Sequence, residues 1–507
     1  MTIDPFIILT HMTKQEILQT SNFGHRVAEE ESKELEKYFV ATDQWQRTFA
    51  GEVDIIYGAK GAGKSALYSL LIQRASELLD RGIIIVSAEQ PRGAPVFRDL
   101  RQDPPTSERE FTGLWKLYFL SLLGATLKEY YAKDDNARRV LDYLEQAKLL
   151  ESTTNLSKML RNVFEYVKRV FRPTAIEGGV KIDPNTGLPI GFSGKISFDE
   201  PATVENQSVM SVDELLKYAD KAFAGLGVTI WILLDRLDIA FAETHELEEN
   251  ALRALFRNYL DLTSLANIRL KIFLRTDIWN RLTKSGFREA SHVTRHLTIL
   301  WDRSSLLSLI MRRVVNNAAI CAYYSIKPEE VFSSIANRST AFYKIFPEQV
   351  DVGPNKPHTL DWMIGRTKDG TGHTAPRELI HLLTASREIQ LRHFEIGDKD
   401  LDGDCLFSRS ALRESLPQIS AVRLMQTLFA EYPNLRPYIE KLSGEKTQQY
   451  IHTLARVWMT AEAEALVIAN NLVEVGFFEL RGTKTTPSFW VPFLYRDATK
   501  MVQGEAD

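Results

Sequence analysis

The stretch that decides the fold of this chain runs Tyr57-Gly58-Ala59-Lys60-Gly61-Ala62-Gly63-Lys64-Ser65. Its spacing matches the G-x-x-x-x-G-K-[ST] phosphate loop, with both glycines, the lysine and the serine in place. The residues before it, 53–57, form an apolar run typical of a buried strand, and residues 66–79 carry apolar side chains at helical spacing. A phosphate loop requires this order of strand, glycine turn and helix, so the chain is predicted to bind a nucleoside triphosphate.

The residue types in the loop suit a bound anion. Glycines at positions 58, 61 and 63 allow backbone conformations closed to residues with a Cβ, so successive N–H groups can turn toward a phosphate at the positive end of the following helix. Lys64 supplies a point charge for the β- and γ-phosphates, and the Ser65 hydroxyl suits Mg²⁺. ATP is favoured over GTP because no N-K-x-D-like guanine motif follows a strand. The expected contacts with ATP come from Gly58, Ala59, Lys60, Gly61, Ala62, Gly63, Lys64, Ser65 and Ala66.

The composition is that of an ordinary globular protein. The chain has 507 residues, a net charge of -4 and only two cysteines, Cys321 and Cys405. The length suggests about two to four domains, and the charge argues against a surface built throughout for nucleic acid. The cysteine count excludes a disulfide framework and a thiolate zinc set. Because there is neither a membrane-length apolar run nor a signal-peptide pattern at the start, we expect a cytoplasmic protein without a membrane contact.

Apolar runs along the chain predict an α/β fold. Separated by helical segments, they indicate a five-stranded parallel sheet with helices on both faces, the architecture of a P-loop NTPase core. The runs are residues 53–57, 82–87, 228–235, 270–274 and 296–300. Residues 173–204 resemble a β-hairpin inserted between core strands. Either an arm that binds a partner or an insertion without a binding role fits that pattern.

The predicted domains are four. An N-terminal helical arm covers residues 1–40, and a P-loop ATPase domain covers 41–300 with a helical and β-hairpin insertion at about 100–225. A helical lid covers 301–412, and a winged-helix-like domain covers 413–507. Winged helices often bind DNA, but the helix that would enter the groove, 461–471, has two glutamates and neither Lys nor Arg. Protein packing is therefore favoured, and a wing contact with phosphates through Arg481, Lys484, Arg496 and Lys500 is the alternative.

A second motif follows the run 228–234. Asp235 ends an apolar strand, where a carboxylate can hold Mg²⁺ beside the loop, so Ser65 and Asp235 are the predicted metal ligands. The sequence Asp235-Arg236-Leu237-Asp238 resembles the D-G-h-D-E signature of NACHT-type members of the STAND class, which are AAA+-related switch ATPases. Arg236 stands where that signature has a small residue, and Ile239 replaces its final acid. Asp238 is the candidate to position or activate the attacking water, and a helix cap is the alternative.

Several arginines resemble residues that read the nucleotide in related ATPases. Arg275 ends the run 270–274, where AAA+ and STAND proteins carry a sensor, and a guanidinium can contact γ-phosphate oxygens bidentately. An ion pair with Asp277 is the alternative. Arg377 looks like the lid sensor of Orc- and Cdc6-like AAA+ ATPases, with an ordinary surface arginine as the alternative. Arg253 and Arg257 lie where AAA+ proteins often place an arginine finger for a neighbouring subunit, so a homo-oligomer is one expectation.

Taken together, residues 23–500 resemble bacterial P-loop ATPases of the STAND and AAA+ kind, which are often found in anti-phage defence loci. The resemblance implies an ATP-hydrolysing switch whose nucleotide state sets assembly with further copies or with a protein effector. Lys64 and Mg²⁺, held by Asp235, would bind the phosphates, Asp238 would orient water, and Arg275 and Arg377 would report the γ-phosphate to the lid. Two alternatives stay open: a DNA-associated AAA+ loader or remodeller, and a nucleotide-binding scaffold with little turnover.

Overall fold

A computed structural model describes residues 12–25, 31, 34–89, 105, 107–130, 132–151, 155–172, 196–198, 209–237, 245–397, 403–483 and 486–506. The chain divides into two compact units. The first, here called the sheet unit, comprises Asp43–Gly58 and Lys64–Ile299. The second, here called the helical unit, comprises Met1–Thr42, Ala59–Gly63 and Leu300–Asp507. The middle residues of the phosphate loop therefore belong to the helical unit, and its first and last residues belong to the sheet unit.

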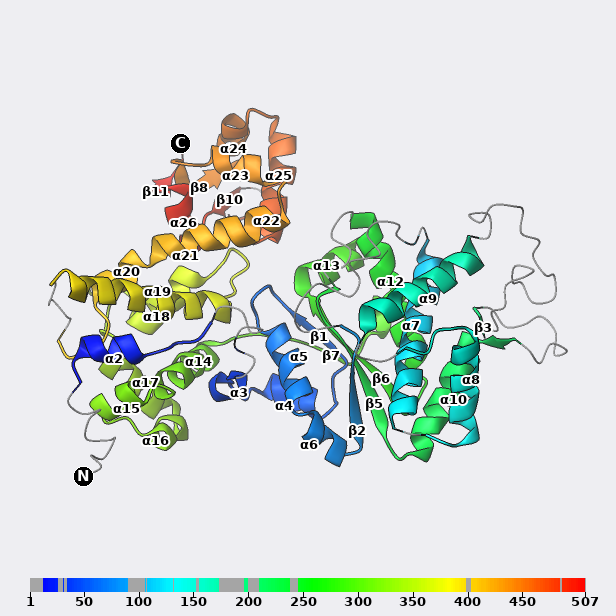
Figure 1. Cartoon of the computed structure of the whole chain (residues 1–507). Helices are drawn as coiled ribbons and strands as arrows, with labels where there is room; N and C mark the ends of the chain where they lie inside the picture. The colour runs from blue at the N-terminus through cyan, green and yellow to red at the C-terminus, as the bar shows by residue number, and fades with distance from the viewer. Residues whose placement is uncertain are drawn as a thin grey trace, which may run out of the picture. The chain divides into compact units, whose positions relative to one another are not determined.

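Five parallel strands form the core of the sheet unit. They lie in the order β2-β5-β6-β1-β7 and are β1 (Ile55–Gly58), β2 (Ile83–Ser87), β5 (Thr229–Leu234), β6 (Ile268–Arg275) and β7 (His296–Thr298). Helices α4 (Asp43–Phe49), α5 (Lys64–Gln73) and α6 (Ala75–Asp80) lie on one face of this sheet (Figure 1). Helices α7 (Glu108–Glu129), α10 (Val212–Gly225) and α12 (His245–Leu262) lie on the other. This arrangement confirms the predicted α/β fold, a five-stranded parallel sheet with helices on both faces.

The register of the strands brings three strand ends to one edge. Gly58 of β1 is paired with Arg275 of β6, and Leu234 of β5 is paired with Ile272 of β6. Because the strands are parallel, their carboxyl ends meet at the same edge of the sheet, where ligands of open α/β folds bind. The phosphate loop follows β1, and Asp235 follows β5, so the topology brings the two sequence motifs to one place.

The remaining helices of the sheet unit bury a large apolar surface. Helix α7 is apolar on nearly all sides, and its residues from Phe111 to Leu127 are mostly inaccessible to solvent, as expected for a helix packed on every face. Helices α8 (Asp135–Gln146) and α9 (Leu156–Phe171) pack against α7. Helix α13 (Thr276–Lys284) packs against β1, β6 and α12, and the short 3-10 helix η3 (Arg288–His292) follows it in the sequence. Of the predicted hairpin at 173–204, only residues 196–198 are described. There β3 (Ile196–Ser197) pairs parallel with β4 (Met210–Ser211).

The helical unit has its own hydrophobic core. It draws together the N-terminal segment, through Ile17, Leu18 and Phe23, and the helices after residue 300. The described helices of this unit up to residue 441 are α2 (Lys14–Thr20), α3 (Leu35–Tyr38), α14 (Arg303–Val315), α15 (Ala318–Tyr323), α16 (Pro328–Ser333), α17 (Ile335–Ile345), α18 (Thr359–Thr367), α19 (Pro376–Glu395), α20 (Arg409–Glu414), α21 (Leu416–Arg423), the π-helix η4 (Leu424–Leu428), α22 (Phe429–Glu431) and α23 (Arg436–Lys441). Among the described helices, none combines the length and the apolar composition needed to cross a membrane.

The C-terminal part of the helical unit has the arrangement of a winged helix. A strand, two helices and an antiparallel hairpin follow one another, and the sheet has the order β11-β8-β10-β9. These elements are β8 (Lys446–Tyr450), α24 (Ile451–Trp458), α25 (Glu462–Glu474), β9 (Glu479–Gly482), β10 (Pro487–Trp490), α26 (Phe493–Thr499) and β11 (Val502–Glu505).

Candidate nucleotide-binding site

The backbone of the phosphate loop explains its glycines. Gly61 and Gly63 have φ of +80° and +104°, a region that residues with a Cβ rarely adopt. The loop then enters α5 at Lys64, and the first turn of a helix leaves N–H groups without intrahelical acceptors. These groups and the helix dipole favour an anion at this point, as the motif predicts.

The predicted metal ligands lie in direct contact. The Ser65 hydroxyl donates a hydrogen bond to Asp235 Oδ2 at 2.8 Å, and Asp235 is only 5% exposed. Lys64 Nζ donates to the carbonyl oxygen of Gly58 at 2.9 Å, which holds the ammonium group over the loop. A hydroxyl and a carboxylate are oxygen donors of the kind that Mg²⁺ prefers, so this pair of residues fits a magnesium ion.

The turn after Asp235 is conformationally unusual. Arg236 has φ of +58°, the left-handed region that costs a residue with a Cβ about 1–2 kcal/mol. A glycine, as in the signature that this stretch resembles, would adopt this turn without that cost because it has no Cβ. Asp238, the predicted water-activating residue, lies outside the described residues.

A second acid lies at the same edge of the sheet. Glu89 comes two residues after β2 and is fully buried. Ser87 is paired with Leu233 across β2 and β5, and the N–H of Ala88 donates to the carbonyl of Leu233 at 2.9 Å. Glu89 and Asp235 therefore follow the ends of neighbouring strands, which lie about 5 Å apart in a sheet.

Tyr68 of α5 lies close to both acids. Its hydroxyl donates to the carbonyl oxygen of Glu89 at 2.5 Å. Burial raises the pKa of the Tyr68 phenol, and the charges of Asp235 and Glu89 raise it further, so Tyr68 stays a hydrogen-bond donor. The sequence analysis did not single out Glu89, although an acid just after an apolar strand is the signal that marks Asp235.

Arg275 forms the ion pair with Asp277 that was the alternative to a sensor role. Its Nε and Nη2 donate to Asp277 Oδ1 and Oδ2 at 3.1 Å and 2.8 Å, and its side chain is 12% exposed. The residue lies at the carboxyl end of β6, in register with Gly58. A sensor role would require the guanidinium to exchange Asp277 for a phosphate.

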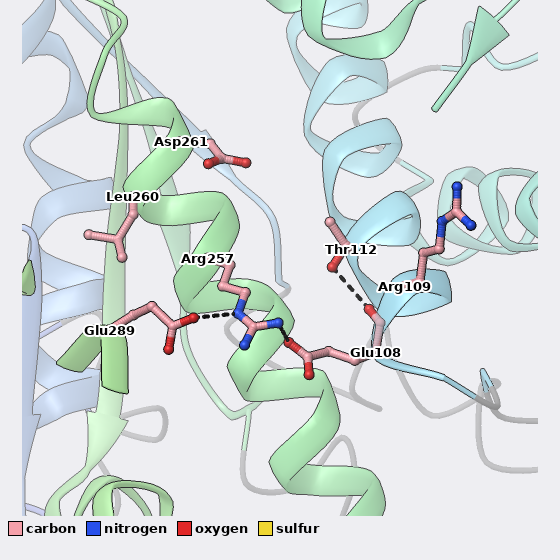
Figure 2. Close-up of a pocket in the computed structure, with 7 residues that line it drawn as sticks. All are labelled: Glu108, Arg109, Thr112, Arg257, Leu260, Asp261 and Glu289. Atoms are coloured by element: carbon pink, nitrogen blue, oxygen red, sulfur yellow. Dashed lines mark hydrogen bonds and ion pairs between the residues drawn. The ribbon is translucent and has the colours of Figure 1, made fainter. Parts of the chain in front are cut away.

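Arg253 and Arg257 also have acidic partners within the sheet unit. Arg253 Nη2 lies 3.1 Å from Glu249 Oε2. Arg257 lies between Glu289, at 2.9 Å, and Glu108, as Figure 2 shows. These three residues line an open pocket of about 530 Å³ together with Arg109, Thr112, Leu260 and Asp261. An arginine-finger role for either residue stays a prediction.

In the helical unit, the start of α19 packs against the phosphate loop. A Cβ placed on Gly61 would lie 3.2 Å from the Cβ of Arg377 and 3.4 Å from that of Ala375. Arg377 follows Pro376 in the first turn of the helix, as predicted. Its Nε is buried and has no hydrogen-bond partner among the residues that the structure describes. A buried guanidinium N–H beside a phosphate loop is suited to an anionic ligand.

Two further contacts hold the loop within the helical unit. The indole Nε1 of Trp301 donates to the carbonyl oxygen of Ala62 at 2.8 Å. Lys60 Nζ forms an ion pair with Glu431, the last residue of α22. Neither contact could be found from the sequence, because neither Trp301 nor Glu431 belongs to a recognisable motif.

Comparisons with known proteins show only distant similarity. No protein-family model and no curated protein matches the sequence. Among solved structures, the chain is similar to the ORC2 protein of Aeropyrum pernix in ADPNP–ADP complexes, with 12% identity and a TM-score of 0.37 over 93% of this chain and 92% of that chain. It is also similar to the ORC1 protein of Aeropyrum pernix in complex with DNA, with 12% identity and a TM-score of 0.33 over 96% of this chain and 97% of that chain. Similarity at this level supports no functional assignment, so the proposal below rests on the motifs and on the geometry of the site.

Proposed function

We propose that this protein binds ATP with Mg²⁺ at residues 58–66 and hydrolyses it as a nucleotide-controlled switch. The contact between Ser65 and Asp235 carries the proposal, because it joins the phosphate loop to the strand-end acid 170 residues away in the sequence. The positive φ at Gly61 and Gly63 is a second, independent sign of a loop shaped to surround an anion.

Each residue of the site has a proposed role. Lys64 and the loop N–H groups bind the β- and γ-phosphates, and Ser65 and Asp235 hold the magnesium ion, which neutralises charge on the phosphates when bound. Asp238 or Glu89 accepts a proton from the attacking water or orients it. Arg377 contacts the phosphates from the lid side of the loop, and Arg275 does so after leaving Asp277.

A switch needs an element whose position depends on the nucleotide. Helix α19 suits this role because its first turn packs against Gly61 and its buried face belongs to the core of the helical unit. We propose that nucleotide exchange or hydrolysis changes this packing and thereby controls assembly with further copies or with a protein effector. Anti-phage defence is the biological setting that the sequence resemblance favours.

Nucleotide titration and phosphate release test this proposal. Lys64→Ala and Asp235→Asn should each weaken binding of a fluorescent ATP analogue or slow Mg²⁺-dependent phosphate release, with roughly a tenfold to hundredfold loss for Lys64→Ala. Lys217→Ala, which changes an exposed lysine on α10, is the matched control and should behave as wild type. Unchanged binding and turnover in Lys64→Ala would refute the assignment. Binding without phosphate release in the wild type would favour the scaffold alternative.

A DNA-associated ATPase is the second candidate because of the winged-helix arrangement. The wing strands carry Arg481, whose guanidinium lies 3.8 Å from the centre of the Trp490 ring. However, Arg481 pairs with Glu479 at 2.9 Å, and α25 begins with acidic residues. A salt-dependent gel shift with duplex DNA, with stimulation of phosphate release, would support this candidate.

A further inference from the structure

One continuous helical segment of the helical unit contacts both the phosphate loop and the start of α19. The segment consists of α21, η4 and α22, which follow one another without a break from Leu416 to Glu431 (Figure 1). Its last residue, Glu431, pairs with Lys60 of the loop. Its residue Arg423 is 9% exposed and contacts Glu378, which directly follows Arg377 in α19.

The middle of the segment is fixed at Arg423 by several groups. Arg423 Nη1 lies 3.0 Å from Glu378 Oε1, and Nη2 lies 3.5 Å from Asp369 Oδ2. Arg423 Nε lies 3.5 Å from the hydroxyl of Tyr495, which belongs to α26 of the winged-helix part. A buried charge network of this kind resists rearrangement, because separating one partner leaves the others buried and uncompensated.

The π-helix between the two charged residues turns them toward the same side. Arg423 and Glu431 are eight positions apart, which in an unbroken α-helix corresponds to about 80° around the axis. A π-turn accommodates one extra residue, so the pair is related about as residues seven apart are, by roughly 20°. The π-helix therefore lets one segment contact α19 and the loop at once.

The Lys60–Glu431 pair brings a carboxylate to a loop that is suited to hold phosphates. The two side chains are 29% and 18% exposed, so solvent screens their interaction only in part. A lysine ammonium that pairs with a carboxylate is less available to a phosphate oxygen, and the carboxylate also repels an approaching triphosphate. Trp301 donates to the carbonyl oxygen of Ala62, two residues beyond Lys60, and so restrains the backbone of this part of the loop.

We propose that Glu431 sets the nucleotide affinity of the phosphate loop by competing with the phosphates for Lys60. This inference rests on the proposed ATP-binding function and adds a positioning residue that acts through Lys60. By linkage, bound nucleotide weakens the Glu431 contact to the same extent that Glu431 weakens nucleotide binding.

Nucleotide titrations of matched variants test the competition. Glu431→Gln should bind a fluorescent ATP analogue roughly threefold to tenfold more tightly than wild type at low salt, and the gain should shrink as salt rises. In a Lys60→Ala background, the same substitution should change affinity by less than about twofold. Glu440→Gln is the control, because this exposed acid pairs with Arg436 at 2.7 Å in α23 and should leave affinity unchanged.

Hydrogen exchange of the wild-type protein gives a second readout that needs no variant. Saturating nucleotide should speed exchange of the amides from Leu428 to Tyr432 by severalfold, because it releases Glu431. Three outcomes would overturn the inference. The first is unchanged or weaker binding in Glu431→Gln, and the second is an equal gain in affinity in Glu440→Gln or in the Lys60→Ala background. The third is slower exchange at these amides. Failure of the wild type to bind nucleotide, or equal binding by Lys64→Ala, would instead refute the proposed function itself.

Discussion

A buried lysine in the central sheet should make the free energy of unfolding rise with pH in the alkaline range. Lys271 of β6 is fully buried, and its Nζ lies 2.8 Å from Asp54 Oδ1 and 4.2 Å from the centre of the Trp231 ring. Asp54 also accepts from Arg295 Nε at 2.7 Å, and its carbonyl accepts from the N–H of Ile272 at 2.8 Å. The cluster thus joins the segment that leads into β1 to β6.

Burial lowers the pKa of Lys271 from 10.5 to about 8, against the opposing attraction of Asp54. The folded protein therefore binds fewer protons than the unfolded chain between these two values, so the free energy of unfolding rises with pH through that window. Since one pKa unit corresponds to about 1.4 kcal/mol, the full change is about 3 kcal/mol. About half of it, roughly 1.5 kcal/mol, falls between about pH 8 and pH 9.5.

Urea unfolding of wild type and Lys271→Met across this range isolates the effect. The methionine keeps an apolar stem against Trp231 and cannot titrate, while Arg295 still pairs with Asp54. The stability of wild type relative to the variant should rise by about 1.5 kcal/mol from about pH 8 to pH 9.5. Higher pH is avoided because burial raises the pKa of Tyr57 and Tyr118, whose ionisation in the unfolded chain lowers stability. A difference that stays constant or falls with pH would refute the reasoning.

Three further substitutions test the site. Gly61→Ala should weaken nucleotide binding by roughly tenfold in a fluorescence titration, because φ of +80° costs about 1–2 kcal/mol and the new Cβ would crowd Arg377. Glu89→Gln should lower the rate of phosphate release by at least about tenfold with nucleotide affinity within about twofold; an unchanged rate would leave Asp238 as the water-activating candidate. Arg423→Met should destabilise the helical unit by about 3–5 kcal/mol in chemical unfolding, because Glu378 and Asp369 stay buried without a cation, and a loss under about 1 kcal/mol would contradict this.

The core of the site was predictable because its signals are local. The phosphate loop is defined by residues adjacent in the sequence, and the apolar runs predict strands that are buried on both faces. Asp235 was found for the same reason, since it directly follows such a run. Parallel pairing then brings the ends of β1 and β5 to one edge, as the register of both with β6 shows.

The sensors were only partly predictable. Arg275 does lie at the end of its strand, but whether it pairs with Asp277 or with a ligand depends on side-chain packing that no pattern encodes. Arg377 was expected at a helix start, and only the folded chain shows that this start packs against Gly61. Glu89 carries a similar local signal, an acid shortly after an apolar run, but only the register of β2 against β5 shows that it lies beside Asp235.

The sequence by itself determined the loop, the parallel sheet and the strand-end acid, since each follows from a short pattern with a direct physical meaning. Only the tertiary structure decided which distant side chains meet: Lys60 with Glu431, Trp301 with Ala62, and Arg423 with Glu378. Such pairs depend on the packing of whole helices and on one π-turn that sets the angle between Arg423 and Glu431. The free energy of those contacts is distributed over the core of the helical unit, so no local stretch of sequence contains the information that specifies them.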